Sequence, residues 1–198
     1  MIKTQAAKLV TGLANKKIIE EKSHDVYTYG FELIISGLVN VFFIAAVSIA
    51  FRRYYDWLLF LLAFIPLRTT AGGYHASSHM RCILCGSAAF FVCMMISQLQ
   101  IDWTFAILAI AVLSFLLILL FSPVEAKNKK LKETVRKKNR TVSIWIGSVN
   151  LMIALSTIFV AGLPDILNIY FAGVFAAAIS MLVVRITASL KKSANATH

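Results

Sequence analysis

The chain alternates between long apolar segments and short polar connections. A run of about 20 apolar residues is long enough to cross the hydrocarbon core of a bilayer as a helix, and several segments approach that length. We therefore predict an all-α fold, a polytopic membrane helical bundle that forms a single domain over residues 1–198. The apolar segments are approximately residues 30–51, 57–67, 83–98, 103–121, 142–161 and 166–184.

The second and third of these six segments are short, and they flank a polar stretch at residues 68–85. Apolar segments of about 10–14 residues are often re-entrant or buried in protein instead of spanning a bilayer alone. Backbone that leaves a helix at membrane depth is tolerated only against protein or beside a water-filled cavity. The polar stretch is therefore the first candidate for a functional site.

Composition supports a membrane location. The chain has 198 residues, of which 59% are hydrophobic, and its mean hydropathy is +0.78. Ordinary soluble domains are about 45–50% apolar. Residues 1–22 are too charged for a secretory signal peptide. Three clustered cysteines (Cys82, Cys85 and Cys93) do not match the disulfide framework of a small secreted protein.

The net charge of +11 is explained better by membrane topology than by nucleic-acid binding, so no nucleic-acid partner is expected. If all six segments cross the membrane, 18 of the 20 lysines and arginines lie on one side. The positive-inside rule places that side in the cytoplasm. The regions that share it are the N-terminal tail (1–29), the polar stretch (68–82), a basic loop (122–141) and the C-terminal tail (185–198).

One pair of basic residues disagrees with this orientation. Arg52 and Arg53 fall on the opposite side, although acidic residues accompany them in the short turns there. The pair leaves a second topology open, in which four segments cross the membrane and the two short ones are re-entrant.

The N-terminal tail has its own pattern. Apolar residues recur in it at helical spacing, between lysines that can reach lipid headgroups. This pattern predicts an amphipathic helix that lies in the cytoplasmic interface, and the alternative is a helix packed on the domain itself. The apolar positions are Ile2, Ala6, Leu9, Val10 and Leu13.

The densest run of positive charge is Lys127–Arg140. Its simplest role is to set the topology and to contact anionic membrane lipids, with about 1 kcal/mol per basic residue near the surface. Its alternative role is a docking surface for an acidic partner, since clustered charge steers and aligns an oppositely charged peptide.

The polar stretch contains a candidate nucleophile. A cysteine becomes reactive as a thiolate, and a neighbouring imidazole is a common means of forming one. His79 and Cys82 are three residues apart and would be neighbours on one helix. On a straight helix His75 and Cys82 would be about 10.5 Å apart along the axis, which is too far for proton transfer. Local geometry alone therefore favours His79.

His75 can reach Cys82 only if the chain folds back between them. Gly72 and Gly73 permit backbone angles that are closed to other residues, and Ser77–Ser78 favour a turn or a helix start. A loop that carries His75, followed by a helix that starts near Ser77 or Ser78 and carries Cys82, would bring the two together.

Two other interpretations of the stretch compete with a cysteine nucleophile. The side chains of His75, His79, Cys82 and Cys85 are all possible zinc ligands, although no second half-site follows in the chain. Alternatively, small and polar residues merely pack helices together. That second interpretation suits Cys85 and Cys93, but ionisable groups at membrane depth are costly and usually functional.

The stretch resembles the signature of the accessory gene regulator B (AgrB) family, which are bacterial membrane cysteine endopeptidases that mature quorum-sensing peptides. The resemblance rests on Arg68, the run Ala71-Gly72-Gly73-Tyr74-His75-Ala76, and Arg81-Cys82. The segment 122–130 (SPVEAKNKK) is similar to the family's proline-plus-basic segment. Chain length and hydropathy profile fit along nearly the whole sequence.

The resemblance implies that Cys82 is the nucleophile and His75 its base, with no cofactor and no metal. It implies an AgrD-type propeptide as substrate, with an amphipathic leader and an acidic C-terminal tail, cleaved through a Cys82 thioester and cyclised to a thiolactone or lactone. It also implies a homodimer in the bacterial cell membrane. The alternative function is a non-enzymatic peptide exporter or scaffold. Candidates for substrate binding or for stabilising the oxyanion are Arg68, Gly72, Gly73, Ser77, Ser78, Lys127, Lys129 and Lys130.

Overall fold

The computed structural model describes residues 2–15, 24–72, 79–99, 102–124, 133–160 and 163–194. Within these residues the fold is all-helical, and the only β-type pairing is an isolated bridge between Gly72 and Val124. The helices are α1 (Ile2–Asn15), α2 (His24–Ala50), α3 (Asp56–Ala71), α4 (His79–Ile96), α5 (Trp103–Phe121), α6 (Glu133–Ser156) and α7 (Leu163–Ala194).

Each of the six predicted apolar segments forms one helix, α2 to α7, which confirms the membrane helical bundle. Three helices are long and apolar enough to cross a bilayer: His24–Ala50, Trp103–Phe121 and Pro164–Thr187. The two short segments form helices of 16 and 18 residues, α3 and α4. The number of passes and the cytoplasmic orientation stay predictions.

Two predicted polar regions are more helical than expected. The prediction of a basic loop over 122–141 is wrong from Glu133 onward, because α6 begins at that residue. Residues 133–140 lack glycine and proline and are rich in lysine and arginine, which favour helix, and Glu133 lies in the first turn, where the helix dipole stabilises an acid. The predicted C-terminal tail at 185–198 likewise continues α7 as far as Ala194.

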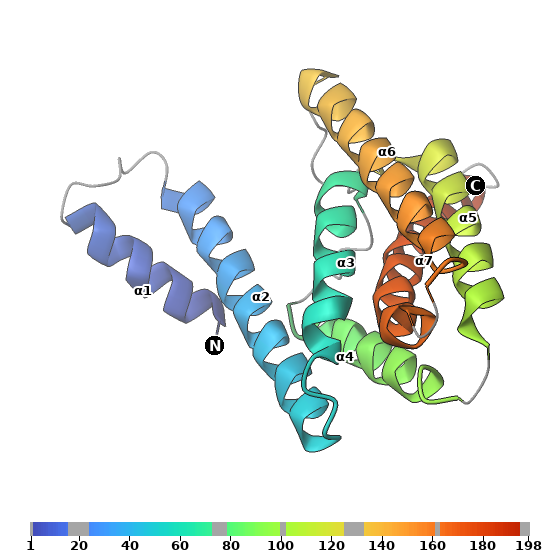
Figure 1. Cartoon of the computed structure of the whole chain (residues 1–198). Helices are drawn as coiled ribbons and strands as arrows, with labels where there is room; N and C mark the ends of the chain where they lie inside the picture. The colour runs from blue at the N-terminus through green and yellow to red at the C-terminus, as the bar shows by residue number, and fades with distance from the viewer. Residues whose placement is uncertain are drawn as a thin grey trace.

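Figure 1 shows α3 near the middle of the molecule, with α6 and α7 beside it and α5 beyond them. The pair formed by α1 and α2 lies on the other side of α3, and α4 crosses at the end of the molecule where α2 ends. The C-terminal ends of α3 and α5 and the N-terminal end of α6 all lie at the opposite end of the bundle.

The amphipathic helix α1 packs along α2. Ala6 and Val10 are completely buried, whereas Leu9 is half exposed. The apolar face of the N-terminal tail therefore packs on the domain, which was the alternative to an interfacial helix. Leu9 lies on the outer side, where lipid headgroups would contact it.

Extensive packing in the core joins α3 to α7. Phe60 and Phe64 of α3 stack with ring centroids 5.4 Å apart, and Phe171 of α7 is fully buried in the same core. Gly173 lets the backbones approach, because a Cβ there would lie 2.7 Å from the Phe60 carbonyl oxygen. Small residues at such crossings are typical of membrane helix packing.

Substituting Gly173→Ala is expected to destabilise the bundle by about 1–3 kcal/mol, because an added methyl group in a packed core forces backbone shifts. The atom it meets is a main-chain oxygen, which cannot rotate away. Thermal unfolding in detergent measures the loss. Gly30→Ala is the matched control, since no described atom beyond its own stretch of helix lies within 4 Å of a Cβ built there, and a midpoint lowered equally by both changes would contradict the packing argument.

Arg53 of the discordant pair belongs to a polar cluster at the turn between α2 and α3. The Arg53 Nε donates to the buried Asp56 carboxylate at 2.7 Å, and an Arg53 guanidinium nitrogen lies 3.4 Å from Ser97 Oγ. The Asn168 amide donates to the Ser97 carbonyl at 3.0 Å. Arg53 is therefore neutralised inside the protein, which weakens its argument against the predicted orientation.

Candidate functional site

The motif begins on the last turn of α3. Arg68 is half-buried, with its guanidinium carbon 5.3 Å from the centroid of the Phe64 ring, a cation–π geometry. Pro66 lies inside the helix, and the hydroxyls of Thr69 and Thr70 donate to the Pro66 carbonyl at 3.0 and 2.8 Å. A cation in the last turn is also stabilised by the helix dipole. These contacts therefore stabilise the last turn of α3.

Gly72 ends α3 in a conformation that other residues avoid. Its φ of 82° and ψ of −173° fall in a region that is essentially restricted to glycine. The Val124 N–H donates to the Ala71 carbonyl at 2.9 Å, and Gly72 pairs with Val124 in a parallel bridge. A Cβ at Gly72 would collide with the Val124 carbonyl oxygen.

This contact joins the two sequence segments that carry the family resemblance. Ser122, which ends α5, donates its backbone N–H to the Ile118 carbonyl at 3.0 Å, and the chain then passes through Pro123 to Val124. The proline segment therefore packs directly against the start of the glycine motif, although more than fifty positions separate Gly72 from Val124 in the sequence. The sequence alone did not predict this contact.

The second half of the motif opens α4. That helix begins at His79 and carries Cys82 on its first turn. Gly72 ends α3 in a non-helical conformation, in agreement with the predicted turn at the glycine pair. Gly73, His75, Ser77 and Ser78 lie outside the described residues, as do the side chains of His79 and Cys82. The His75–Cys82 pairing stays a prediction.

α4 is held in place by α2 and α3. Ser87 Oγ donates to the Asn40 side-chain oxygen at 3.2 Å, and a Cβ at Gly86 would lie 3.1 Å from the Asn40 amide nitrogen. Phe90 meets Phe60 edge to face at a centroid distance of 5.2 Å. These contacts fix the helix that carries Cys82, and Asn40 is a supporting residue that sequence analysis missed, since nothing around it in α2 is polar enough to form a motif.

The other two cysteines on α4 differ in their surroundings. Cys85 is exposed, three residues after Cys82 and so on the next turn. Cys93 is partly buried, with its sulfur 3.8 Å from the Ala172 carbonyl oxygen. The zinc alternative depends on His75 and on the side chains of His79 and Cys82, which lie outside the described residues, so it stays untested.

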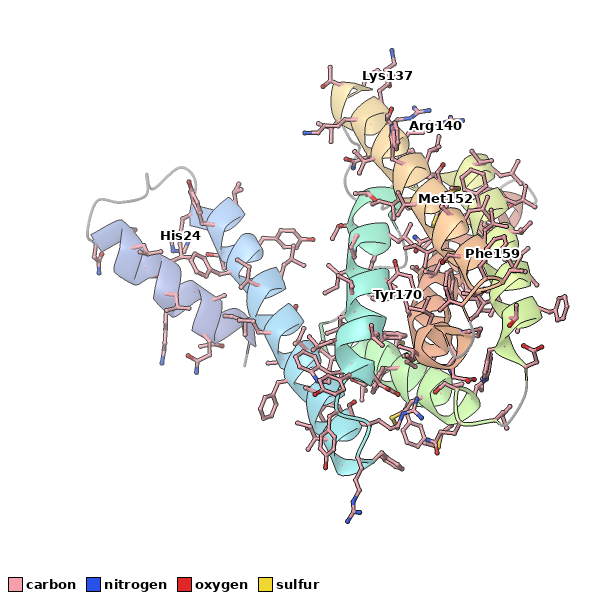
Figure 2. All side chains as sticks on the ribbon, in the orientation of Figure 1. His24, Lys137, Arg140, Met152, Phe159 and Tyr170 are labelled. Atoms are coloured by element: carbon pink, nitrogen blue, oxygen red, sulfur yellow. The ribbon has the colours of Figure 1, made fainter. Side chains whose placement is uncertain are left out.

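The basic segment is described only from Glu133 onward, so Lys127, Lys129 and Lys130 lie outside the described residues. Its helical part is highly charged and accessible. Figure 2 shows Lys137 and Arg140 on the projecting N-terminal end of α6. Arg136 and Lys138 are exposed on the same turns. This end of α6 adds an accessible positive surface near Val124 that an acidic partner can reach.

Comparison with known proteins identifies the same family as the motif. The chain matches the family model described as Accessory gene regulator B over residues 6–186. It is similar to two proteins of Clostridium perfringens that are named AgrB-like. One is 25% identical over 163 residues, covering 74% of each chain. The other is 25% identical over 166 residues, covering 75% of this chain and 76% of the relative. No solved structure matches the chain.

Proposed function

The chain belongs to the AgrB family, and from that premise we propose that it is a membrane cysteine endopeptidase acting on an AgrD-type propeptide. Membership places it in the agr quorum-sensing system, and its apolar helices make it a membrane protein. The observation that carries the proposal is the break at Gly72, which ends α3 ahead of His75 in the sequence and ahead of α4, the helix that carries Cys82.

In the proposed reaction, His75 removes the proton of the Cys82 thiol, and the thiolate attacks a peptide carbonyl at the C-terminal end of the signal region. The tetrahedral oxyanion collapses and expels the amine of the acidic tail, which takes its proton from the His75 imidazolium. The signal peptide is left as a thioester on Cys82. Candidate donors to the oxyanion are Arg68 and the backbone amides of Ser77 and Ser78.

Ring closure follows on the same sulfur. A cysteine or serine of the peptide attacks the Cys82 thioester, its proton passes to His75, and Cys82 leaves as a thiolate. The exchange of one thioester for another has a small free-energy change, so the site must chiefly exclude water and position the attacking group. The contact between Gly72 and Val124 supports this role, because it holds the first half of the motif against the rest of the bundle.

The acidic tail of the substrate requires a positive surface. We propose that Lys127, Lys129 and Lys130 hold it, together with the exposed lysines of α6. Clustered charge of this kind raises the association rate and sets the register of an acidic peptide. Dimerisation stays a prediction of the family resemblance, and the cytoplasmic location of both termini stays a prediction of the charge distribution.

The test is to reconstitute the protein in vesicles with the propeptide and to record its intact mass. We expect an adduct on Cys82 equal to the leader plus signal region, together with release of the acidic tail. The adduct should be removed by neutral hydroxylamine, which cleaves thioesters. The matched control is Cys85→Ala, because Cys85 is an exposed thiol one turn away, and this variant should form the same adduct.

Two outcomes would contradict the proposal. If the tail is released without any adduct on Cys82, hydrolysis proceeds by another route. If no tail is released although the propeptide binds, the chain acts as an exporter or scaffold.

A further inference from the structure

A basic pocket of about 350 Å³ lies where α5 ends and α6 begins, beside the C-terminal half of α7. Arg136 and Arg140 reach it from the first turns of α6, and Arg185 reaches it from α7. Its remaining wall is Ser122 to Val124 and the last turn of α5. Neither the proposed reaction nor the motif uses these three arginines.

Among the described residues, little negative charge compensates the arginines of the pocket. Arg136 lies 3.8 Å from Glu133, but both side chains are more than half exposed, and such ion pairs are weak. Arg185 lies over the Phe121 ring at 5.8 Å, a contact that leaves its charge in place. None of the described residues that line the pocket is Asp or Glu. Three guanidinium groups around one space therefore favour an anion.

The apolar part of the lining indicates which anion. Leu120 and Val184 lie near the ends of two helices that are long enough to cross a bilayer, and both line the pocket. Val112, Leu116 and Leu120 are spaced by four residues on α5 and therefore share one face. They are 47, 48 and 69% exposed. An open apolar row thus runs from the membrane zone up to the three arginines.

We propose that this pocket binds the phosphodiester headgroup of an anionic phospholipid, with an acyl chain along the exposed face of α5. Basic pockets between membrane helices are suited to such headgroups, and guanidinium groups bind phosphate in a bidentate geometry. An acidic peptide or a free phosphate ion would use the arginines but not the apolar row.

The proposed lipid site is adjacent to the segment that contacts the start of the motif. Val124 lines the pocket and, through its backbone, holds the Ala71 carbonyl and Gly72. The proposed lipid site and the start of the motif therefore share Val124 as a common contact.

The test measures binding on the purified protein in a neutral detergent, with phosphatidylglycerol or phosphatidylcholine added. Native mass spectrometry should show retained phosphatidylglycerol, and that lipid should raise the unfolding temperature more than phosphatidylcholine does. In the Arg140→Gln/Arg185→Gln variant the affinity should fall about 30-fold, since two basic contacts near an anionic lipid are lost.

Two variants separate the pocket from general surface charge. Lys137→Gln/Lys138→Gln removes the same number of charges from exposed positions on α6 that do not line the pocket, and it should bind phosphatidylglycerol as the original chain does. Arg140→Lys/Arg185→Lys should retain more than half of the binding. The exposed single change Arg140→Gln keeps the test valid if Arg185→Gln disturbs its packing on Phe121.

Three results would overturn the proposal. The first is equal loss of binding in the lysine pair and the arginine pair. The second is equal stabilisation by inorganic phosphate at the same concentration, which shows an anion site without a lipid. The third is displacement of bound phosphatidylglycerol by an acidic peptide with no acyl chain. Because the readout is binding, it is independent of whether the propeptide reaction is correct.

Discussion

Replacing Cys82 with alanine is expected to abolish propeptide cleavage, with a loss on the order of 10⁴-fold or more, as when the nucleophile of a covalent mechanism is removed. His75→Ala should reduce the rate about 10²- to 10⁴-fold, because it removes the base that forms the thiolate and the acid that protonates the leaving amine. The measurement is release of the acidic tail from the propeptide in vesicles, followed by mass spectrometry. Membrane insertion and helix content should be unchanged in both variants.

His79→Ala separates the two possible imidazole partners. His79 begins the helix that carries Cys82 and is three residues from it, so local spacing alone favours it, whereas the family motif assigns the role to His75. We expect His79→Ala to retain most of the activity. If His79→Ala were inactive and His75→Ala active, the helical neighbour would be the base and the assignment from the family would be wrong.

Substituting Gly72→Ala is expected to reduce both stability and cleavage. The backbone at Gly72 has a φ of 82°, where a side chain is strained by about 1–3 kcal/mol, and the added Cβ would collide with the Val124 carbonyl oxygen. The bridge to Val124 should open, and the start of the motif should lose its support. Thermal unfolding in detergent measures the first effect, and tail release measures the second.

Two further variants identify the cause of this effect. Gly37→Ala in α2 is the matched control, since within the described part of the chain no atom outside the neighbouring helical backbone lies within 4 Å of a Cβ there. Alanine is also the better helix former, so this change should be neutral or slightly stabilising. Val124→Ala combined with Gly72→Ala should not restore activity, because the collision is with the main-chain oxygen of residue 124 and not with its side chain. Full activity of Gly72→Ala would show that the bridge has no role in the reaction.

The helices were predictable because each apolar segment is a local property of the chain. Segments such as 103–121 are uniformly apolar, and backbone amides in lipid must be paired within the same segment, which leaves the helix as the solution for each of them. Prediction failed at the ends of the helices. Charged residues do not stop a helix, so α6 extends through the basic run to Glu133 and α7 extends to Ala194.

Part of the candidate site could also be predicted from local sequence. The glycine pair predicted a turn at the start of the motif, and Gly72 ends α3 there with a backbone conformation open to glycine. The partner of that break was not predictable. Val124 donates to the Ala71 carbonyl from a segment more than fifty residues away, and no periodicity connects the two.

The sequence by itself determined the helical membrane class and the family, and it supplied the prediction of the reactive residues, because composition, period and motif spacing are properties of neighbouring positions. Only the tertiary structure decided that α1 packs on α2, that Arg53 is neutralised by Asp56, and that three arginines from α6 and α7 surround one pocket. In a chain whose helices are apolar on nearly every face, hydrophobicity does not specify which faces meet. That choice depends on shape, at close contacts such as Gly173 against Phe60 and Gly72 against Val124.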